Sequence, residues 1–277
     1  MRETSARARA RGLRVGFVPT MGCLHEGHLS LMRETKQHSD ILVVSIFVNP
    51  TQFGEGEDFE AYPRQLERDT DHCVAEGVDY LFTPTVEELY SDGPRCHVEV
   101  EGISDELEGH SRPGHFRGVA TVVTKLLHTV RPHVLTLGQK DAQQAVVVRR
   151  MVADLFFDVE VVVARTVRAA DGVALSSRLR YLDPRQRSAA RMTVAAIEAA
   201  REALLSAGGD PEPVLAAARA AIEAEPLLQV DYVELVDPVT LQPVNKVKTE
   251  ALLLLAVHCG PIRLLDNAVL QAPRLLD

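Results

Sequence analysis

Two histidines three positions apart mark the first segment in which the residue types suggest chemistry. His25 and His28 belong to VPTMGCLHEGHLSLM, residues 18–32, at an expected junction between a strand and a helix. Positions i and i+3 share a helix face, and the first turn of a helix attracts anions through its free N–H groups and dipole. The pattern therefore favours a polyphosphate cradle over two unrelated core or surface histidines. No third ligand has the spacing of a zinc site.

A lysine, an aspartate and a glutamine follow another apolar segment, in GQKDAQQ, residues 138–144. Lys140 stands where a cation could reach a phosphate, and Asp141 could accept hydrogen bonds from ribose hydroxyls. Gln144 lies one turn further on and would face the same crevice. Taken alone, the segment is equally typical of a helix cap with an exposed lysine.

Hydroxyl groups and an arginine come together in ALSSRLRYLDP, residues 174–184. Ser176, Ser177 and Arg178 offer several donors that could hold phosphate oxygens at once. Arg180 could join them or remain a solvated surface charge. Standing alone, the pattern Ser-Ser-Arg is more typical of an ordinary loop.

Uncharged amides follow a third apolar run, in SIFVNPTQF, residues 45–53. Asn49 and Gln52 would be delivered to the carboxyl end of a buried strand. An Asx turn around Pro50 would explain Asn49 but not Gln52.

The Gly- and Pro-rich segment LEGHSRPGHFRGV, residues 107–119, offers four further polar side chains before an expected helix. This segment either closes over the site or caps that helix. The four side chains are Glu108, Arg112, His115 and Arg117.

These residues follow strands that alternate with helices. Strands are expected at 13–20, 41–48, 78–85, 133–138 and 158–164, and helices at 27–36, 64–77, 116–130 and 142–155. This alternation predicts an α/β fold with a parallel sheet covered on both faces. In such sheets ligands bind at the carboxyl ends of the strands.

The pattern changes near Thr166, where we place a domain boundary. An Ala-rich helical stretch at 185–209 and a second at 211–224 precede three strands, expected to be antiparallel, at 229–238, 251–260 and 261–270. The Ala bias is explained by helix propensity or genome composition and carries no functional information.

Composition excludes several classes of protein. With 277 residues, 46% of them hydrophobic and 25% charged, the chain has an ordinary globular composition. Its net charge of −9 argues against a general nucleic-acid binder.

The apolar runs of the chain fall short of the roughly 20 residues of a membrane span, and its Arg-rich start has no apolar signal core. That start is expected to be a short basic helix or a frayed end. Four scattered cysteines indicate reduced thiols in a cytoplasmic protein.

Together the segments resemble the pantoate–β-alanine ligase family. The pieces that carry the resemblance are VPTMGCLHEGHLSL, VNPTQF, YPRQLERD, LEGHSRPGHFRGVATVV, GQKDAQQ and LSSRLRYLDP, in the family's order over about residues 15 to 190. The His-x-Gly-His pattern alone would indicate only the wider nucleotidyltransferase superfamily. The C-terminal part of the chain matches more loosely.

The resemblance implies a Rossmann-like domain, residues 1–166, that binds nucleotide and pantoate, and a smaller α+β lid domain, residues 167–277. It also implies a cytoplasmic homodimer that needs Mg²⁺. Pantoate would attack the α-phosphate of ATP to give pantoyl adenylate and pyrophosphate. The amine of β-alanine would then attack the activated carbonyl and release AMP and pantothenate, a precursor of coenzyme A.

The resemblance also implies roles for individual residues. His25 and His28 would contact the triphosphate, with His28 the family's usual proton donor, while Lys140 and Arg178 would stabilise charge. Gln52 and Gln144 would hold pantoate, supported by Asn49, and Glu108 and Arg112 would organise the site. The ATP site would comprise Met21, Gly22, Cys23, Leu24, His25, Glu26, Gly27, His28, Gly138, Gln139, Lys140, Asp141, Val167, Leu175, Ser176, Ser177 and Arg178.

Three residues depart from the family's pattern. Leu175 stands where Met is usual, Leu179 where Asn is usual, and Cys23 in place of a common small residue. The segment before the first strand is also shorter than usual.

Two other hypotheses stay open: a small-molecule nucleotidyltransferase with a stable nucleotide product, and a non-catalytic nucleotide-binding protein. The pair Gln52 and Gln144 argues against the first, and the retained charged and imidazole groups argue against the second. A tRNA synthetase is excluded by size and by the lack of an evident tRNA-binding extension.

Overall fold

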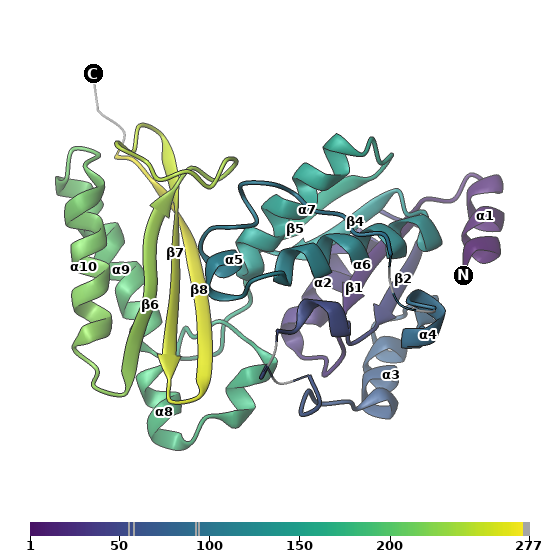
Figure 1. Cartoon of the computed structure of the whole chain (residues 1–277), viewed down its shortest axis with the longest axis horizontal. Helices are drawn as coiled ribbons and strands as arrows, with labels where there is room; N and C mark the ends of the chain where they lie inside the picture. Colours follow the sequence, from purple (N-terminus) through teal and green to yellow (C-terminus); the bar gives the residue numbers. More distant parts are fainter. Residues whose placement is uncertain (55, 58, 92, 94, 274–277) are drawn as a thin grey trace. The chain divides into compact units, whose positions relative to one another are not determined.

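The computed structural model of the chain describes residues 1–54, 56–57, 59–91, 93 and 95–273. The chain divides into two compact units, Met1–Arg165 and Thr166–Asp277 (Figure 1). Within the described residues, no helix is both long and apolar enough to cross a membrane. All four cysteines are free thiols.

The first unit is built on a five-stranded parallel sheet with the strand order β3-β2-β1-β4-β5. The strands are β1 (Val15–Thr20), β2 (Ile41–Ile46), β3 (Tyr80–Phe82), β4 (Val134–Gly138) and β5 (Glu160–Ala164). The order reverses at β1, since β2 and β3 are added on one side of it and β4 and β5 on the other. Ligands of such sheets bind at the carboxyl ends of the strands beside this switch point. The predicted Rossmann-like parallel sheet is confirmed.

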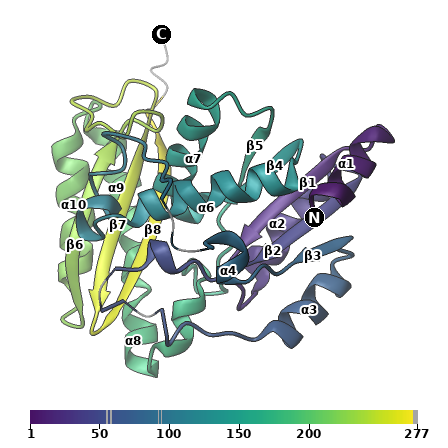
Figure 2. The same ribbon diagram turned by 45° about the vertical axis from the view of Figure 1, so that its right-hand side comes forward.

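Helices cover both faces of this sheet (Figures 1 and 2). Successive strand residues point to opposite faces, so Phe17 of β1 joins a core with α6 and α7, whereas Val18 packs with α2 and α3. The helical segments are α1 (Arg2–Ala10), α2 (Glu26–Lys36), η1 (Pro50–Gln52), α3 (Leu66–Ala75), α4 (Val86–Leu89), α5 (Glu108–Ser111), α6 (His115–Val130), η2 (Gln139–Asp141) and α7 (Ala142–Asp154).

Helix α2 lies close to the sheet because β1 has a glycine at the crossing. A Cβ atom on Gly16 would come within 2.3 Å of Thr35 Cγ2. The Thr35 hydroxyl donates to Leu31 O at 2.7 Å and also bonds Thr136 Oγ1 of β4 at 2.7 Å. This seating fixes α2 over β1 and β4, so that its first turn lies beside the carboxyl ends of both strands.

The second unit is a three-stranded antiparallel sheet with helices packed on it (Figures 1 and 2). Its elements are η3 (Ser177–Tyr181), α8 (Pro184–Ala189), α9 (Met192–Ser206), α10 (Pro211–Glu223), β6 (Leu228–Val236), β7 (Glu250–Cys259) and β8 (Ile262–Gln271). The small residues Ala196 and Ala200 of α9 are fully buried. The Ala-rich sequence therefore serves close packing as well as helix propensity.

The structure corrects two expectations about elements. The stretch 185–209 is two helices, because the Thr193 N–H and hydroxyl both bond Ala190 O, at 3.2 and 2.9 Å. Such back-bonding replaces the helical ladder at the junction. The strand expected at 78–85 is only Tyr80–Phe82, because Thr85 begins α4 through a capping box with Glu88. The Arg-rich start is helical, as one of the two expectations stated.

Candidate active site

The loop between β1 and α2 is held by a buried carboxylate. Gly22 and Cys23 adopt positive φ angles of 82° and 51°. Asp69 of α3 is 1% exposed and accepts the N–H groups of Cys23 and Leu24, each at 2.8 Å. A Cβ atom on Gly22 would lie 2.9 Å from Asp69 Oδ2. Asp69 therefore turns the chain so that α2 begins with His25 as its cap.

The two histidines form a capping box at this helix start. Nδ1 of His25 accepts from the Gly27 N–H at 3.1 Å, and Nδ1 of His28 accepts from the His25 N–H at 3.3 Å. The ring centroids are 4.1 Å apart. A neutral imidazole that accepts at Nδ1 carries its proton on Nε2. Both rings therefore offer an Nε2–H donor.

Burial keeps both imidazoles neutral near pH 7. Loss of hydration lowers the pKa of His25 to about 4 and that of His28 to about 3. The nearby His25 lowers the pKa of His28 further, Lys140 lowers the pKa of both rings, and Asp141 acts in the opposite direction. Neutral rings can donate hydrogen bonds to an anion without adding positive charge.

Lys140 and Asp141 reach the histidines from the neighbouring strand. They belong to η2, directly after β4, and the Lys140 ammonium lies 3.1 Å from the Asp141 carboxylate. The structure thus brings four predicted residues, His25, His28, Lys140 and Asp141, to the switch point of the sheet. The Asp141 carboxylate is half exposed, and its role with ribose hydroxyls stays a prediction.

The amides after β2 form a second cluster. Asn49 Oδ1 accepts from the hydroxyls of Tyr90 and Thr51, at 2.8 and 3.0 Å. Its Nδ2 therefore donates, to Gln52 Oε1 at 3.1 Å and to Gly118 O at 3.2 Å. This orients the Gln52 amide with its NH₂ group toward Met21 Sδ, 3.1 Å away. Gln52, which follows β2, thus contacts Met21, which follows β1, and the group that it directs there is a hydrogen-bond donor.

The segment before α6 is bonded to this cluster. Its expected loop contains a short helix, α5, and Arg112 pairs with Glu57 at 2.7 Å. His115 Nδ1 lies 2.8 Å from Gln52 O, and Arg112 donates to the same oxygen at 3.3 Å. Burial lowers the pKa of His115 to about 4, with a smaller contribution from Arg112. Arg117 is exposed and apart from these contacts.

Gln143 and Gln144 divide their roles on α7. Gln143 is buried, accepts the Glu108 N–H at 3.0 Å and donates to Ile103 O and Glu106 O. The predicted residue, Gln144, is partly buried, and its amide bonds no other group in the described part of the chain. Gln143 thus holds the backbone of Glu108 in place, while the amide of Gln144 is available to bind a ligand.

The second unit contains the Ser-Ser-Arg segment. Ser176 Oγ accepts the Arg178 N–H at 3.2 Å and caps η3. The Leu175 N–H bonds Val167 O at 2.9 Å, so these two predicted residues lie side by side.

Sequence reasoning assigned no role to Asp69, Tyr90, Glu57 or Gln143. A signal existed for Asp69, since residues 66, 69 and 73 fall on one helical face, where a carboxylate is unusual. The hydroxyl of Tyr90 and the carboxylate of Glu57 meet their partners only in the fold, 39 to 55 residues away.

Comparison with known proteins shows the family of the chain. The family model described as pantoate-beta-alanine ligase matches residues 1–269. The chain belongs to the pantoate–β-alanine ligase family. As a member it is an enzyme, and its reaction joins pantoate to β-alanine.

Relatives in this family cover nearly the whole chain. The pantothenate synthetase of Pelotomaculum thermopropionicum is 52% identical over 95% of this chain and 93% of its own length. The crystal structure of the Thermus thermophilus enzyme has a TM-score of 0.90 and 47% identity, covering 95% of this chain and 96% of that one. A Francisella tularensis pantoate–β-alanine ligase, solved with beta-gamma ATP and β-alanine, has a TM-score of 0.77, 34% identity, and coverage of 96% and 94%.

Proposed function

We propose that the chain makes pantothenate through a pantoyl adenylate. A carboxylate oxygen of pantoate attacks the α-phosphorus of ATP; the new O–P bond forms as the bond to the β-phosphate breaks, and pyrophosphate leaves. The amine of β-alanine then attacks the carbonyl carbon, loses its proton to solvent and expels AMP. The first step converts a poor electrophile into one with a good leaving group.

The observation that carries this proposal is the gathering of donors at the β1–β4 switch point. Two neutral imidazoles with Nε2–H donors, the first turn of α2 and the Lys140 ammonium converge there. Developing charge on transferred phosphate is stabilised mainly by positioning and by such fixed dipoles and cations. Pantoate needs no base, because its carboxylate is already ionised near neutral pH.

We also propose roles for individual residues. His25 and His28 donate to the triphosphate, Lys140 neutralises charge on it, and Arg178 with its two serines completes the clamp. Residues 21–28, 138–141, 167 and 175–178 line the nucleotide. Support for ATP as the nucleotide comes from the Francisella tularensis relative, whose structure is a complex with beta-gamma ATP and β-alanine.

The amide cluster is the proposed pantoate site. Pantoate carries a carboxylate and two hydroxyls, whose oxygens accept hydrogen bonds. The NH₂ group of Gln52, oriented by Asn49, and the amide of Gln144 match these acceptors. Glu108 and Arg112 organise the same region through Gln143 and Glu57.

Mg²⁺ is proposed to enter with ATP. Among the described residues, no group of three or more His, Cys, Asp or Glu side chains could hold a metal ion. Mg²⁺ is commonly held by substrate phosphates with few protein ligands, so this donor set fits an ion carried by the triphosphate. The ion would neutralise phosphate charge, while Lys140 and the histidines hold the nucleotide in place.

We further propose that residues 1–166 bind nucleotide and pantoate, that residues 167–277 act as a lid, and that the enzyme is a cytoplasmic homodimer. Motifs in both parts of the chain imply that ATP draws them together. Small-angle scattering should show a smaller radius of gyration with an ATP analogue, and light scattering should give the mass of a dimer. Unchanged scattering profiles would reject closure.

The test of the function follows pyrophosphate and AMP separately. Purified enzyme with ATP, Mg²⁺ and pantoate should release pyrophosphate once, and AMP and pantothenate should accumulate only after β-alanine is added. A folded, ATP-binding protein that releases no pyrophosphate on addition of pantoate would overturn the proposal. That result would favour another acid substrate or a non-catalytic role for the protein.

A further inference from the structure

We propose that two ion pairs in the second unit, Arg168–Asp266 and Asp171–Arg187, position Ser176, Ser177 and Arg178 for adenylate formation. This inference rests on the proposed phosphate clamp and deepens it. The four ion-paired residues touch no substrate in the proposal. They act by fixing the backbone on both sides of the clamp.

The chain folds back on itself immediately before the clamp. Arg168 pairs with Ala174 in an isolated antiparallel bridge, and the Ala169 N–H bonds Val173 O at 2.9 Å. We call residues 167–175 the clamp hairpin. Its turn contains Gly172, whose φ of 87° is readily adopted only by glycine. The clamp therefore begins where this hairpin ends.

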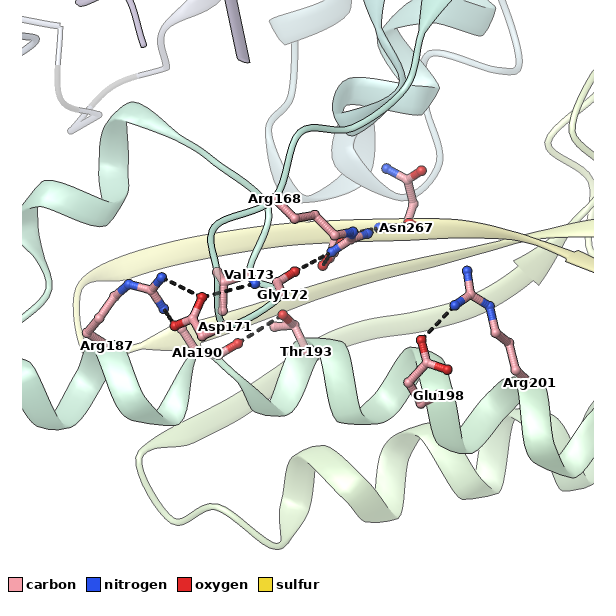
Figure 3. A network of polar contacts seen from close by, with 11 residues as sticks. Arg168, Asp171, Gly172, Val173, Arg187, Ala190, Thr193, Glu198, Arg201 and Asn267 are labelled. Carbon is pink, nitrogen blue, oxygen red and sulfur yellow. Dashed lines mark hydrogen bonds and ion pairs between the residues drawn. The ribbon is translucent and has the colours of Figure 1, made fainter. Parts of the chain in front are cut away.

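Arg168 ties the base of the clamp hairpin to β8. Its guanidinium bonds both oxygens of Asp266, at 2.7 and 2.8 Å. It also donates to Gly172 O at 3.0 Å (Figure 3). Asp266 is only 3% exposed and further accepts the Asn267 N–H at 2.8 Å. A bidentate pair of this kind fixes geometry as well as charge. The hairpin is thereby held at one orientation on the sheet.

Asp171 ties the tip of the clamp hairpin to the element that follows the clamp. Its carboxylate contacts both terminal nitrogens of Arg187 on α8, at 2.7 and 2.9 Å (Figure 3). Helix α8 begins directly after η3, where Asp183 accepts the Arg185 N–H at 2.8 Å. The Asp171–Arg187 pair therefore joins the residues before the clamp to the residues after it. The pair closes the loop, residues 171–187, that contains Ser176, Ser177 and Arg178.

Closing this loop matters for the first chemical step. Nucleotidyl transfer depends on holding the reacting groups in line, and a displacement of about 1 Å can lower the rate about a hundredfold. The second step, attack of an amine on a bound adenylate, leaves no triphosphate to clamp. Loosening the loop should therefore slow adenylate formation much more than amide formation.

The experiment uses Arg187→Gln and Asp171→Asn, because this pair is partly exposed and its loss spares the buried Asp266. The matched control is Arg201→Gln, which removes the same charge from the exposed Glu198–Arg201 pair on α9 (Figure 3). We expect pantoate-dependent pyrophosphate release to fall about tenfold or more in both test variants, with a raised KM for ATP. The rate of pantothenate formation from supplied pantoyl adenylate should stay within about twofold.

Two further variants separate positioning from folding. Exchanging the charges in the double variant Asp171→Arg, Arg187→Asp should restore part of the lost pyrophosphate rate. Equal losses in both half-reactions, or test variants within about twofold of Arg201→Gln, would overturn the inference. Arg178→Gln serves as the reference for clamp loss. A normal rate there would reject the clamp itself, whereas absence of pyrophosphate with the unaltered enzyme would reject the proposed function.

Discussion

The backbone N–H of His25 donates to Nδ1 of His28 at 3.3 Å, and the two rings lie with their centroids 4.1 Å apart. One residue thus fixes the tautomer of the other. With its own Nδ1 bonded to Gly27, His25 has the same tautomer. The pair presents donors rather than acceptors, and it does so as neutral groups.

This neutrality predicts a pH dependence of stability. The folded-state pKa values, about 4 for His25 and about 3 for His28, lie below the unfolded value of about 6.5. The unfolded chain therefore binds more protons between these values. The contribution to stability is complete above about pH 6.5 and is lost as the pH falls through about 4 for His25 and about 3 for His28. Urea unfolding of the native enzyme should show a lower free energy of unfolding at about pH 5 than at about pH 7.5.

The variant His28→Gln should lose part of that pH dependence, because one depressed pKa is removed. The exposed His110 provides the control, and His110→Gln should keep the native slope. Equal slopes in all three proteins would contradict the assignment of a neutral, buried imidazole to His28.

Lys140 is predicted to act in adenylate formation and to contribute little to folding. Lys140→Ala should lower pantoate-dependent pyrophosphate release by about two orders of magnitude or more, the usual scale for loss of one stabilising donor at developing charge. Its urea midpoint should stay close to that of the exposed-site control Lys248→Ala. A nearly normal rate in rapid-quench measurements would remove Lys140 from the mechanism.

Asp69 is predicted to shape the loop from Gly22 to Leu24. Asp69→Asn replaces an acceptor with an NH₂ group facing a backbone N–H, at a cost of about 1–3 kcal/mol in the free energy of unfolding. ATP affinity should fall as well, because the start of α2 shifts. Asp71→Asn, on the exposed side of the same helix, is the control. Equal urea midpoints and equal ATP affinities in the two variants would contradict this role of Asp69.

Gln52 is predicted to recognise pantoate as a donor. Gln52→Glu keeps the size and introduces a carboxylate beside an anionic substrate, so the KM for pantoate should rise about ten- to hundredfold while that for ATP changes little. Tyr90→Phe should give a smaller rise, because Thr51 still bonds Asn49. Gln242→Glu, at an exposed position, is the control. A rise confined to the KM for ATP would place Gln52 on the nucleotide instead.

The sequence predicted the sheet well because its strands carry local signals. Apolar runs such as residues 41–46, each followed by a polar segment, are typical of parallel strands buried on both faces. The sequence also placed His25 and Lys140 after two of the strands, and the structure shows that these strands, β1 and β4, are neighbours in the sheet. Their proximity follows from this strand order, which the sequence did not predict.

What the sequence missed depends on contacts between distant residues. Asp69 meets the Cys23 N–H across 46 positions, and Arg168 meets Asp266 across 98. Local pattern carries no information about such pairs. The break at Ala190 was missed for another reason, because the Thr193 hydroxyl competes with the helical ladder in a sequence that otherwise favours one helix.

The most direct test of the adenylate account is to follow the carboxylate oxygens of pantoate. Pantoate labelled with oxygen-18 in its carboxylate, incubated with ATP, Mg²⁺ and β-alanine, should yield AMP carrying one labelled oxygen, seen by mass spectrometry. The labelled oxygen bridges carbon and phosphorus in the intermediate and leaves with phosphorus when the amine attacks. Unlabelled AMP in a reaction that still makes pantothenate would contradict the account, because the carboxylate would then never have been joined to the α-phosphate.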